Sequence, residues 1–187
     1  TSTQDGHVVN MLGKAVTLRS SDPSDPDVVA ATIINGEDIR RGIACFNEET
    51  NKTLIEGLTI TNGVGVGFDY GSGDINYFEE CGGGMFNYIS SPTVTNCTFT
   101  GNVAHGNWGG GMFNWSSSPT LDGCTFTNNA SGTGGGMLNY NNSSPTLENC
   151  TFTNNTAYYG GVGFPSIDGG GMYNSNSNPV LDGCTFE

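Results

Sequence analysis

A repeated motif occupies the second half of the chain and constrains its fold more than any other feature. Four segments align with one another: 82–102, 109–129, 134–155 and 169–187. Each begins with Gly-Gly-Gly-Met, passes through a proline and reaches Cys-Thr-Phe near its end. The methionines of these segments lie at positions 85, 112, 137 and 172, so the spacings are 27, 25 and 35 residues. A period of this size is typical of supersecondary units that stack on one another.

The interior of each repeat predicts its strands. Three short extended runs recur: Met-x-Asn, then Thr-Val or Thr-Leu after the proline, then Cys-Thr-Phe-Thr. An Asn or Gly, residue types that tolerate a left-handed backbone, separates the second run from the third. Glycine makes up 30 of the 187 residues, which disfavours helices. Three strands and tight corners per coil predict an all-β fold, the right-handed single-stranded parallel β-helix, a solenoid of about six to seven coils.

The rest of the chain fits the same template less regularly. Residues 1–62 form the less regular N-terminal coils, in which Leu58 takes the place of the cysteine and Ile60 that of the phenylalanine. Residues 63–81 form an insertion loop, and 82–187 carry the regular repeats. We expect one continuous domain. Because the chain stops after a third strand without a polar cap, we also expect it to be a fragment of a longer array.

The alternation of side chains along each strand assigns the interior. Four inward columns are predicted: Val94, Leu121, Leu147 and Leu181; Phe99, Phe126, Phe152 and Phe186; Cys97, Cys124, Cys150 and Cys184; Met85, Met112, Met137 and Met172. An asparagine ladder is expected at Asn87, Asn114, Asn139 and Asn174. Cysteines stacked at one register point in parallel, a poor geometry for a disulfide, which favours buried free thiols. Cys45 and Cys81 lie outside the column, and a bridge between them is an open alternative.

The Gly-Gly-Met and Phe-Thr-Asn-Asn elements carry a resemblance to a known family. They occur at Gly83–Met85 with Phe99–Asn102, and again in the next two repeats, whereas the last repeat ends before its asparagine. They resemble the GGA[ILV] and FxxN repeats of polymorphic outer-membrane autotransporter proteins and, more broadly, right-handed parallel β-helix repeats of bacterial secreted and surface proteins. Methionine replaces the branched aliphatic residue of that family. The resemblance implies the fold and an extracellular setting, but β-helix rungs serve adhesins and lyases alike.

The charge distribution argues against several functions. The five bases are all within residues 1–52, whereas 53–187 contain ten acids and no Lys or Arg. A net charge of -13 disfavours nucleic acid as a partner, and without a long apolar run we expect no membrane insertion. A polysaccharide lyase would lack its basic residue in the repeats. The outward acids Asp122, Glu148 and Asp182 would suit a glycosidase, yet solvated acids before a turn explain them, so we expect no enzyme.

Outward positions on the first strand of each repeat offer a binding face. Rings flanking the inward Met and Asn would form two exposed aromatic columns on a rigid sheet, able to stack on a polysaccharide or to contact a host or cell-surface protein. Alternatively, the rings stack on one another or are covered by the insertions. The residues of this aromatic face are Phe86, Tyr88, Phe113, Trp115, Tyr140 and Tyr173, and Trp108 would extend it.

A second candidate surface is the outward face of the third strand, where Thr recurs at alternate positions. Its flat, uncharged grid would resemble that of ice-binding β-helices, although Thr is favoured on any exposed β face. The ladder consists of Thr59, Thr61, Thr98, Thr100, Thr125, Thr127, Thr151 and Thr153.

Calcium is the only cofactor for which the sequence offers ligands. The carboxylates of Asp22, Asp25 and Asp27, or those of the long insertion, could supply oxygen atoms, although neither group fits a defined loop motif. The insertion acids are Asp69, Asp74, Glu79 and Glu80. Taken together, the sequence predicts a secreted or cell-surface β-helix segment that acts as an adhesive or scaffolding module, with the ice-binding face and a β-helix lyase or hydrolase as alternatives.

Overall fold

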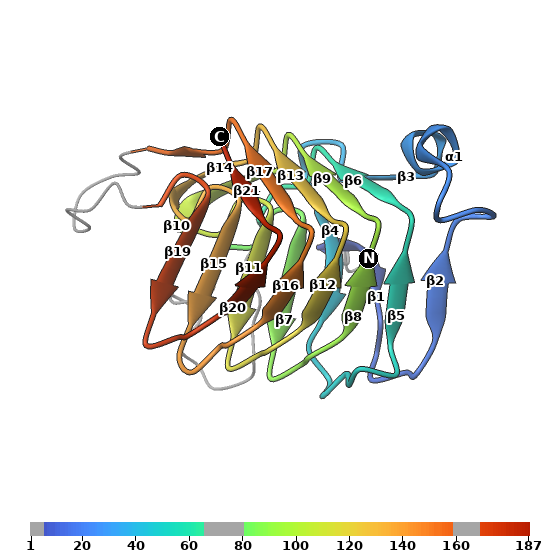
Figure 1. The fold of residues 1–187 in the computed structure, drawn as a ribbon, viewed down its shortest axis with the longest axis horizontal. Helices are drawn as coiled ribbons and strands as arrows, with labels where there is room; N and C mark the ends of the chain where they lie inside the picture. The colour runs from blue at the N-terminus through green and yellow to red at the C-terminus, as the bar shows by residue number, and fades with distance from the viewer. Residues whose placement is uncertain (1–5, 66–80, 159–168) are drawn as a thin grey trace, which may run out of the picture.

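The chain folds into stacked parallel sheets wound around one core (Figure 1). The structure is a computed structural model that describes residues 6–65, 81–158 and 169–187. Most of the predicted insertion loop 63–81 therefore lies outside the described residues. Three sheets, here A, B and C, each contain six parallel strands, and one strand from each makes a rung of the solenoid. This confirms the predicted right-handed parallel β-helix, with six rungs.

The strands of the three sheets follow the predicted runs. Sheet A consists of β1 (His7–Asn10), β4 (Arg41–Cys45), β7 (Met85–Tyr88), β11 (Met112–Trp115), β15 (Met137–Tyr140) and β19 (Met172–Ser175). Sheet B consists of β2 (Thr17–Arg19), β5 (Leu54–Glu56), β8 (Thr93–Thr95), β12 (Thr120–Asp122), β16 (Thr146–Glu148) and β20 (Val180–Asp182). Sheet C consists of β3 (Ile33–Asn35), β6 (Thr59–Thr61), β9 (Thr98–Thr100), β13 (Thr125–Thr127), β17 (Thr151–Thr153) and β21 (Thr185–Phe186).

Two further elements lie outside this frame. A three-stranded sheet D, with β10 (Val103–Trp108), β14 (Ala130–Thr133) and β18 (Thr156–Ala157), was not predicted. The helix α1 (Pro26–Ala31) is inserted between β2 and β3. Its first turn is capped by Asp25, whose side chain accepts a hydrogen bond from the backbone N–H of Asp27, and Pro26 at the first helical position suits the cap.

The inward columns are confirmed by the register. Phe126 lies opposite Phe99 on one side and Phe152 on the other, and all three are buried. Neighbouring rings stack with centroids 4.7 Å apart and planes within 5° of parallel, as far as Phe186. Ile60 continues the column toward the N-terminus, as predicted. The parallel register therefore places identical side chains on one another. Each buried ring stabilises the fold by about 1.5–3 kcal/mol because its apolar surface is removed from water.

The corners between sheets B and C depend on a left-handed residue. Asn96, Gly123, Asn149 and Gly183 have φ of 51°, 61°, 52° and 60°, which confirms the predicted bend. A second requirement for glycine comes from the close approach of rungs. A Cβ on Gly84, Gly111 or Gly136 would lie 2.4–2.5 Å from the carbonyl oxygen of the matching glycine one rung further on. This contact explains the glycine before each methionine.

Buried polar side chains form ladders along the axis. The predicted ladder is confirmed, because the Asn87, Asn114 and Asn139 side chains each donate to the asparagine of the next rung at 2.8 Å. A second ladder of Asn102, Asn129 and Asn155 was not predicted. A serine ladder was also missed, in which each backbone N–H bonds to the serine hydroxyl of the next rung: Ser90, Ser117, Ser143 and Ser177.

The cysteines are free thiols, as predicted for the column. Cys97, Cys124 and Cys150 are buried, and Cys184 in the last rung is half-buried. The suggested bridge between Cys45 and Cys81 is wrong, since both are free. Cys45 packs in the core enclosed by the solenoid, whereas Cys81 packs in a separate cluster with Phe86 and Phe113 on the outer face of sheet A. The sheet itself separates the two sulfur atoms.

Candidate functional site

The outer face of sheet A carries the predicted aromatic residues, but two of them are not exposed. Phe86 and Phe113 are 1% and 0% exposed, so the prediction that they form an exposed column is wrong. They pack with Phe46 and Cys81 in a second apolar cluster, and their rings stack 4.9 Å apart. The physical reason is that residues outside sheets A, B and C cover this face. One of them is Trp108 of β10, whose ring centroid lies 5.5 Å from that of Phe113.

The outer column at the ends of β7, β11 and β15 is more accessible. Tyr88, Trp115 and Tyr140 are half-buried and lie in register. The Trp115 and Tyr140 rings are 4.7 Å apart and tilted by 39°. Trp108 stacks on both, at 5.9 Å and 5.4 Å, so the structure brings these rings together. We call Tyr88, Trp108, Trp115 and Tyr140 the aromatic strip. Tyr173, half-buried in the last rung, is not part of it, because its position continues the column of Phe86 and Phe113.

The threonines of sheet C form the regular outward face that the sequence predicts. All eight lie in register on β6, β9, β13 and β17 and are half-buried. The hydroxyls of Thr98 and Thr125 make no hydrogen bond within the described residues. The N-terminal end of this face is not an open grid, however, because the Thr59 hydroxyl donates to the carbonyl of Val29 in α1 at 2.9 Å.

A groove separates α1 from the threonine face. Its volume is about 450 Å³. The lining is mixed and carries no charged side chain: Pro23, Ser24, Pro26, Val29, Ala30, Thr59, Asn96, Thr98, Gly123 and Thr125. This groove could not be predicted from the sequence, because α1 departs from the repeat and nothing in its residues places it beside later rungs.

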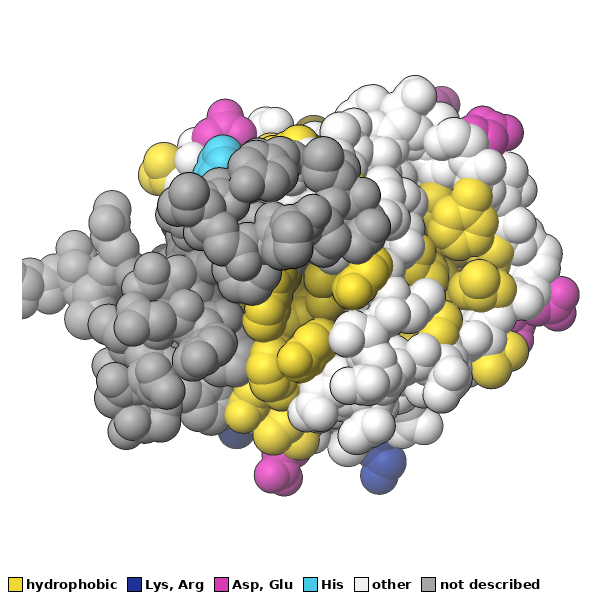
Figure 2. Space-filling view, turned by 90° about the vertical axis from the view of Figure 1, so that its left-hand side faces the viewer, with side chains coloured by type: hydrophobic (Ala, Val, Ile, Leu, Met, Phe, Trp, Pro, Cys, Tyr) yellow, Lys and Arg dark blue, Asp and Glu magenta, His cyan; other side chains and the backbone are white. Residues whose placement is uncertain are grey.

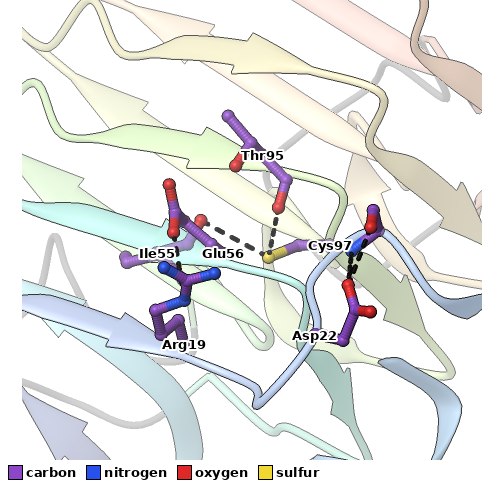
Figure 3. A network of polar contacts seen from close by, with 7 residues as sticks. Arg19, Asp22, Ile55, Glu56, Thr95 and Cys97 are labelled. Carbon is purple, nitrogen blue, oxygen red and sulfur yellow. Dashed lines mark hydrogen bonds and ion pairs between the residues drawn. The ribbon is translucent and has the colours of Figure 1, made fainter. Parts of the chain in front are cut away.

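The acids proposed as calcium ligands have local roles. Asp22 accepts hydrogen bonds from the hydroxyl and the backbone N–H of Ser24 (Figure 3), and these bonds lower the pKa of its carboxyl. Asp25 caps α1, and Asp27 follows in its first turn. Within the described residues, no three His, Cys, Asp or Glu side chains are grouped to hold a metal ion. The insertion acids Asp69, Asp74, Glu79 and Glu80 lie outside the described residues.

The carboxylates weighed as a glycosidase pair stand in one column of sheet B. Asp122, Glu148 and Asp182 are in register and exposed. Toward the N-terminus the same column continues through Thr95 to Glu56 and Arg19. Arg19 and Glu56 form an ion pair of 3.6 Å (Figure 3). The column therefore begins with a base and ends with acids, a pattern that the repeat alone does not reveal.

The second rung contains a buried cation, at the start of β4, that sequence reasoning did not single out. Arg41 is 0% exposed and donates to the carbonyls of Gly82 and Cys81 and to Nδ1 of His7. It also lies over the rings of Phe46 and Phe86, 5.5 Å and 5.2 Å from their centroids. Burial, together with the charge of Arg41, lowers the pKa of His7 to about 4. At neutral pH His7 is uncharged and accepts from the guanidinium.

Burial makes the thiols of Cys81 and Cys97 poor nucleophiles. It raises the pKa of Cys97 to about 12 and that of Cys81 to about 11. Since the thiolate is the reactive form, neither sulfur is suited to catalysis or metal binding at neutral pH.

Comparisons with known proteins agree with the fold. Within the described residues, no helix is long and apolar enough to span a membrane. Searches of curated proteins and of solved structures found no match. The family model described as "Right handed beta helix region" matches residues 41–187, which include five of the six rungs. The chain belongs to the right-handed β-helix family.

Proposed function

We propose that the chain is a non-catalytic scaffolding or adhesive segment of a secreted or cell-surface protein, and that it binds a glycan through the aromatic strip. The observation that carries this proposal is the pair Trp115 and Tyr140, half-exposed and 4.7 Å apart on adjacent rungs. Aromatic faces of this kind stack on the apolar faces of sugar rings and bury large areas at low entropic cost. Parallel strands on both sides hold the rings in place.

Three features support a non-catalytic, extracellular role. The outward acids of sheet B point to solvent, and Asp122 accepts a hydrogen bond from the Asn149 amide at 3.1 Å. Burial raises the pKa of the Cys81 and Cys97 thiols, so these two stay protonated and resist oxidation in an oxidising compartment. The net charge of the chain is strongly negative, -13, which favours neutral or basic partners over nucleic acid.

The test is binding to a glycan array. Trp115→Ala and Tyr140→Ala should each weaken binding by about tenfold, equivalent to about 1.4 kcal/mol, whereas Trp115→Phe should retain most of it because a ring remains. Thr120→Ala, an exposed position on sheet B, is the matched control. Glycan binding that survives both alanine variants would contradict the proposal, as would strip-dependent capture of a protein without any glycan signal. Release of unsaturated uronide from pectin or alginate would overturn the non-catalytic assignment.

A second candidate function, ice binding, is favoured by one specific observation. Six threonines of β9, β13 and β17 lie in register, half-buried, with no hydrogen bond from their hydroxyls within the described residues. Thermal hysteresis measures this activity. Thr125→Tyr should abolish it by breaking the flat face, whereas Thr120→Tyr, on the other sheet, should leave it unchanged. Absence of hysteresis in the unmodified chain would remove this candidate.

A further inference from the structure

The groove beside α1 is formed by an insertion that the solenoid does not require. In the later rungs the chain passes from sheet B to sheet C in two residues, such as Asn96 and Cys97 between β8 and β9. In the first rung, residues 20–32 take this place and carry α1, which projects from the stack of strands (Figure 1). The other five corners between these sheets, all of them described by the structure, have no such insertion. The insertion therefore adds a wall beside sheet C that the repeat does not supply.

Hydrogen bonds hold this wall against the threonine face. Asp25 caps the first turn of α1, and at the other end the Thr32 hydroxyl donates to the carbonyl of Val28 at 2.8 Å. The Thr59 hydroxyl of β6 donates to the carbonyl of Val29 at 2.9 Å. The Thr59 backbone N–H donates to the carbonyl of Thr32 at 3.0 Å. Because α1 is fixed in this way, little conformational entropy is lost when a ligand binds against it.

The floor of the groove carries polar side chains that have no partner within the described residues. Thr98 and Thr125 lie opposite each other on adjacent rungs, which are about 4.8 Å apart, and neither hydroxyl makes a hydrogen bond. The side-chain amide of Asn96 makes none either. Its Oδ1 lies over Gly123, where a Cβ would be only 2.6 Å away from it. All four residues line the groove, so two hydroxyls and one amide are available to a ligand.

The side of the groove formed by the insertion is mainly apolar. Pro23, Pro26, Val29 and Ala30 line it. The groove thus offers apolar contact on one side and hydrogen bonds on the other, as pockets for small polar molecules do. A sugar has this combination, because its ring presents C–H groups on its faces and hydroxyl groups at its edge.

The charges around the groove favour a neutral ligand. Among the described residues, no charged side chain lines it. Asp25, Asp27 and Asp122 are exposed and adjoin lining residues along the chain, so an anionic ligand would meet like charges at the rim. Figure 2, which views a different side of the molecule from Figure 1, shows charged side chains scattered among uncharged ones. The groove therefore suits hydroxyl groups better than carboxylates or phosphates.

We propose that this groove binds a short segment of a neutral oligosaccharide. Hydroxyl groups of the sugar hydrogen-bond to Thr98, Thr125 and the Asn96 amide. A C–H face of the sugar packs against Pro26 and Ala30. The groove volume of about 450 Å³ lies within the range of roughly 300–1,000 Å³ that is usual for small-molecule sites. Because the groove lies on sheet C and the aromatic strip on sheet A, this is a second site, and either site can fail its test without the other.

Nuclear magnetic resonance titration of the Trp115→Ala variant tests the groove while binding at the aromatic strip is weakened. The neutral probes are the hexamers of cellulose, xylan and chitin, and the anionic probe is a galacturonate hexamer. At least one neutral hexamer should shift the backbone amide resonances of Thr98, Thr125 and Ala30 in a saturable way. The galacturonate hexamer should bind more weakly because of the acids at the rim.

Substitutions in the groove then identify the contacts. Thr98→Val and Thr125→Val each remove one hydroxyl and keep the branched shape, so each should raise the Kd of the neutral hexamer by about three- to tenfold, the effect of one neutral hydrogen bond. Thr151→Val, in the same column one rung beyond the groove, is the matched control and should leave the Kd unchanged. Ala30→Leu should fill the groove and raise the Kd more than about tenfold. Its far-ultraviolet circular dichroism should stay unchanged, because Ala30 is exposed and leucine is a good helix former.

Four results would overturn the proposal. The first is the absence of saturable shifts at these amides with every neutral hexamer. The second is a loss of affinity in Thr151→Val equal to that in Thr98→Val. The third is binding of the galacturonate hexamer as tight as that of the neutral ones. The fourth is a proline-rich peptide that shifts these amides when no sugar does, since the groove would then be a peptide site.

Discussion

At the scale of single residues, the structure shows how a polar chain builds a dry interior. Asn114 is 0% exposed, yet its side chain accepts from Asn87 and donates to Asn139, both at 2.8 Å. A buried amide is tolerated only when its hydrogen bonds are made. Because the following rungs repeat the asparagine, Asn114 and Asn139 each accept from one neighbour and donate to the other. The ladder ends at Asn87, whose Oδ1 has no hydrogen-bond partner within the described residues because Cys45 takes the asparagine position in the rung before it.

Asn114→Ala should therefore be costly. It removes two bonds and leaves polar atoms of the adjacent asparagines unpaired in the interior, so the free energy of unfolding should fall by about 2–4 kcal/mol. Urea denaturation measures the change, and Asn51→Ala, at an exposed turn position, is the control. Equal stability of the two variants would mean that the ladder bonds contribute nothing net.

The half-buried imidazole of His7 makes stability depend on pH. Its folded pKa of about 4 lies below the ordinary 6.5, so between these values the unfolded chain binds more protons than the folded one. Stability is complete above pH 6.5 and is lost as pH falls toward 4, on the order of 1–2 kcal/mol once solvent screening is allowed for. His7→Gln should flatten this part of the stability profile in thermal denaturation. Thr120→Ala, at an exposed position without a titratable group, should leave the slope as it was.

At the scale of elements, the repeat predicts what lies inside the rung and fails outside it. Alternation along the strand placed Phe99 and Leu121 inward because the enclosed face must be apolar. The same rule predicted that Phe86 is exposed because it points outward. Alternation within one strand does not indicate whether another segment covers its outer face. Phe46 packs against Phe86 and Trp108 packs against Phe113 in the same cluster, and both belong to segments without the repeat. The serine ladder was detectable in principle, since Ser-Ser-Pro or its variant recurs in every regular repeat.

Glycine positions give a prediction at this scale. Gly111→Ala places a Cβ 2.5 Å from the Gly136 carbonyl oxygen, so adjacent rungs must separate, and the expected loss is about 2–3 kcal/mol. Gly101→Asn should be tolerated, because its Cβ would meet nothing nearer than 3.8 Å and Asn128 has the same left-handed φ one rung further on. Thermal denaturation compares the two. Similar melting temperatures would contradict the role assigned to close approach of the rungs.

At the scale of the whole molecule, each rung contacts only its neighbours, so position along the axis determines the cost of a change. The phenylalanine column allows a comparison of one residue type in one environment. Phe126 is stacked on both sides and 0% exposed, whereas Phe186 is stacked on one side and 47% exposed.

Phe126→Ala should lower the free energy of unfolding by about 3–5 kcal/mol, whereas Phe186→Ala should lower it by about 1–2 kcal/mol because half of the ring already contacts water. Urea titration measures both. Similar losses at the two positions would show that the terminal rung is as tightly packed as the central one.

The constant register between rungs of 27, 25 and 35 residues has an evolutionary consequence. Since pairing depends on the columns and not on the length of the corners, a whole coil can be duplicated or deleted by recombination within the gene without disturbing its neighbours. Lineages can thus lengthen or shorten the rod, and diversify its corners, while the interior sequence stays nearly fixed.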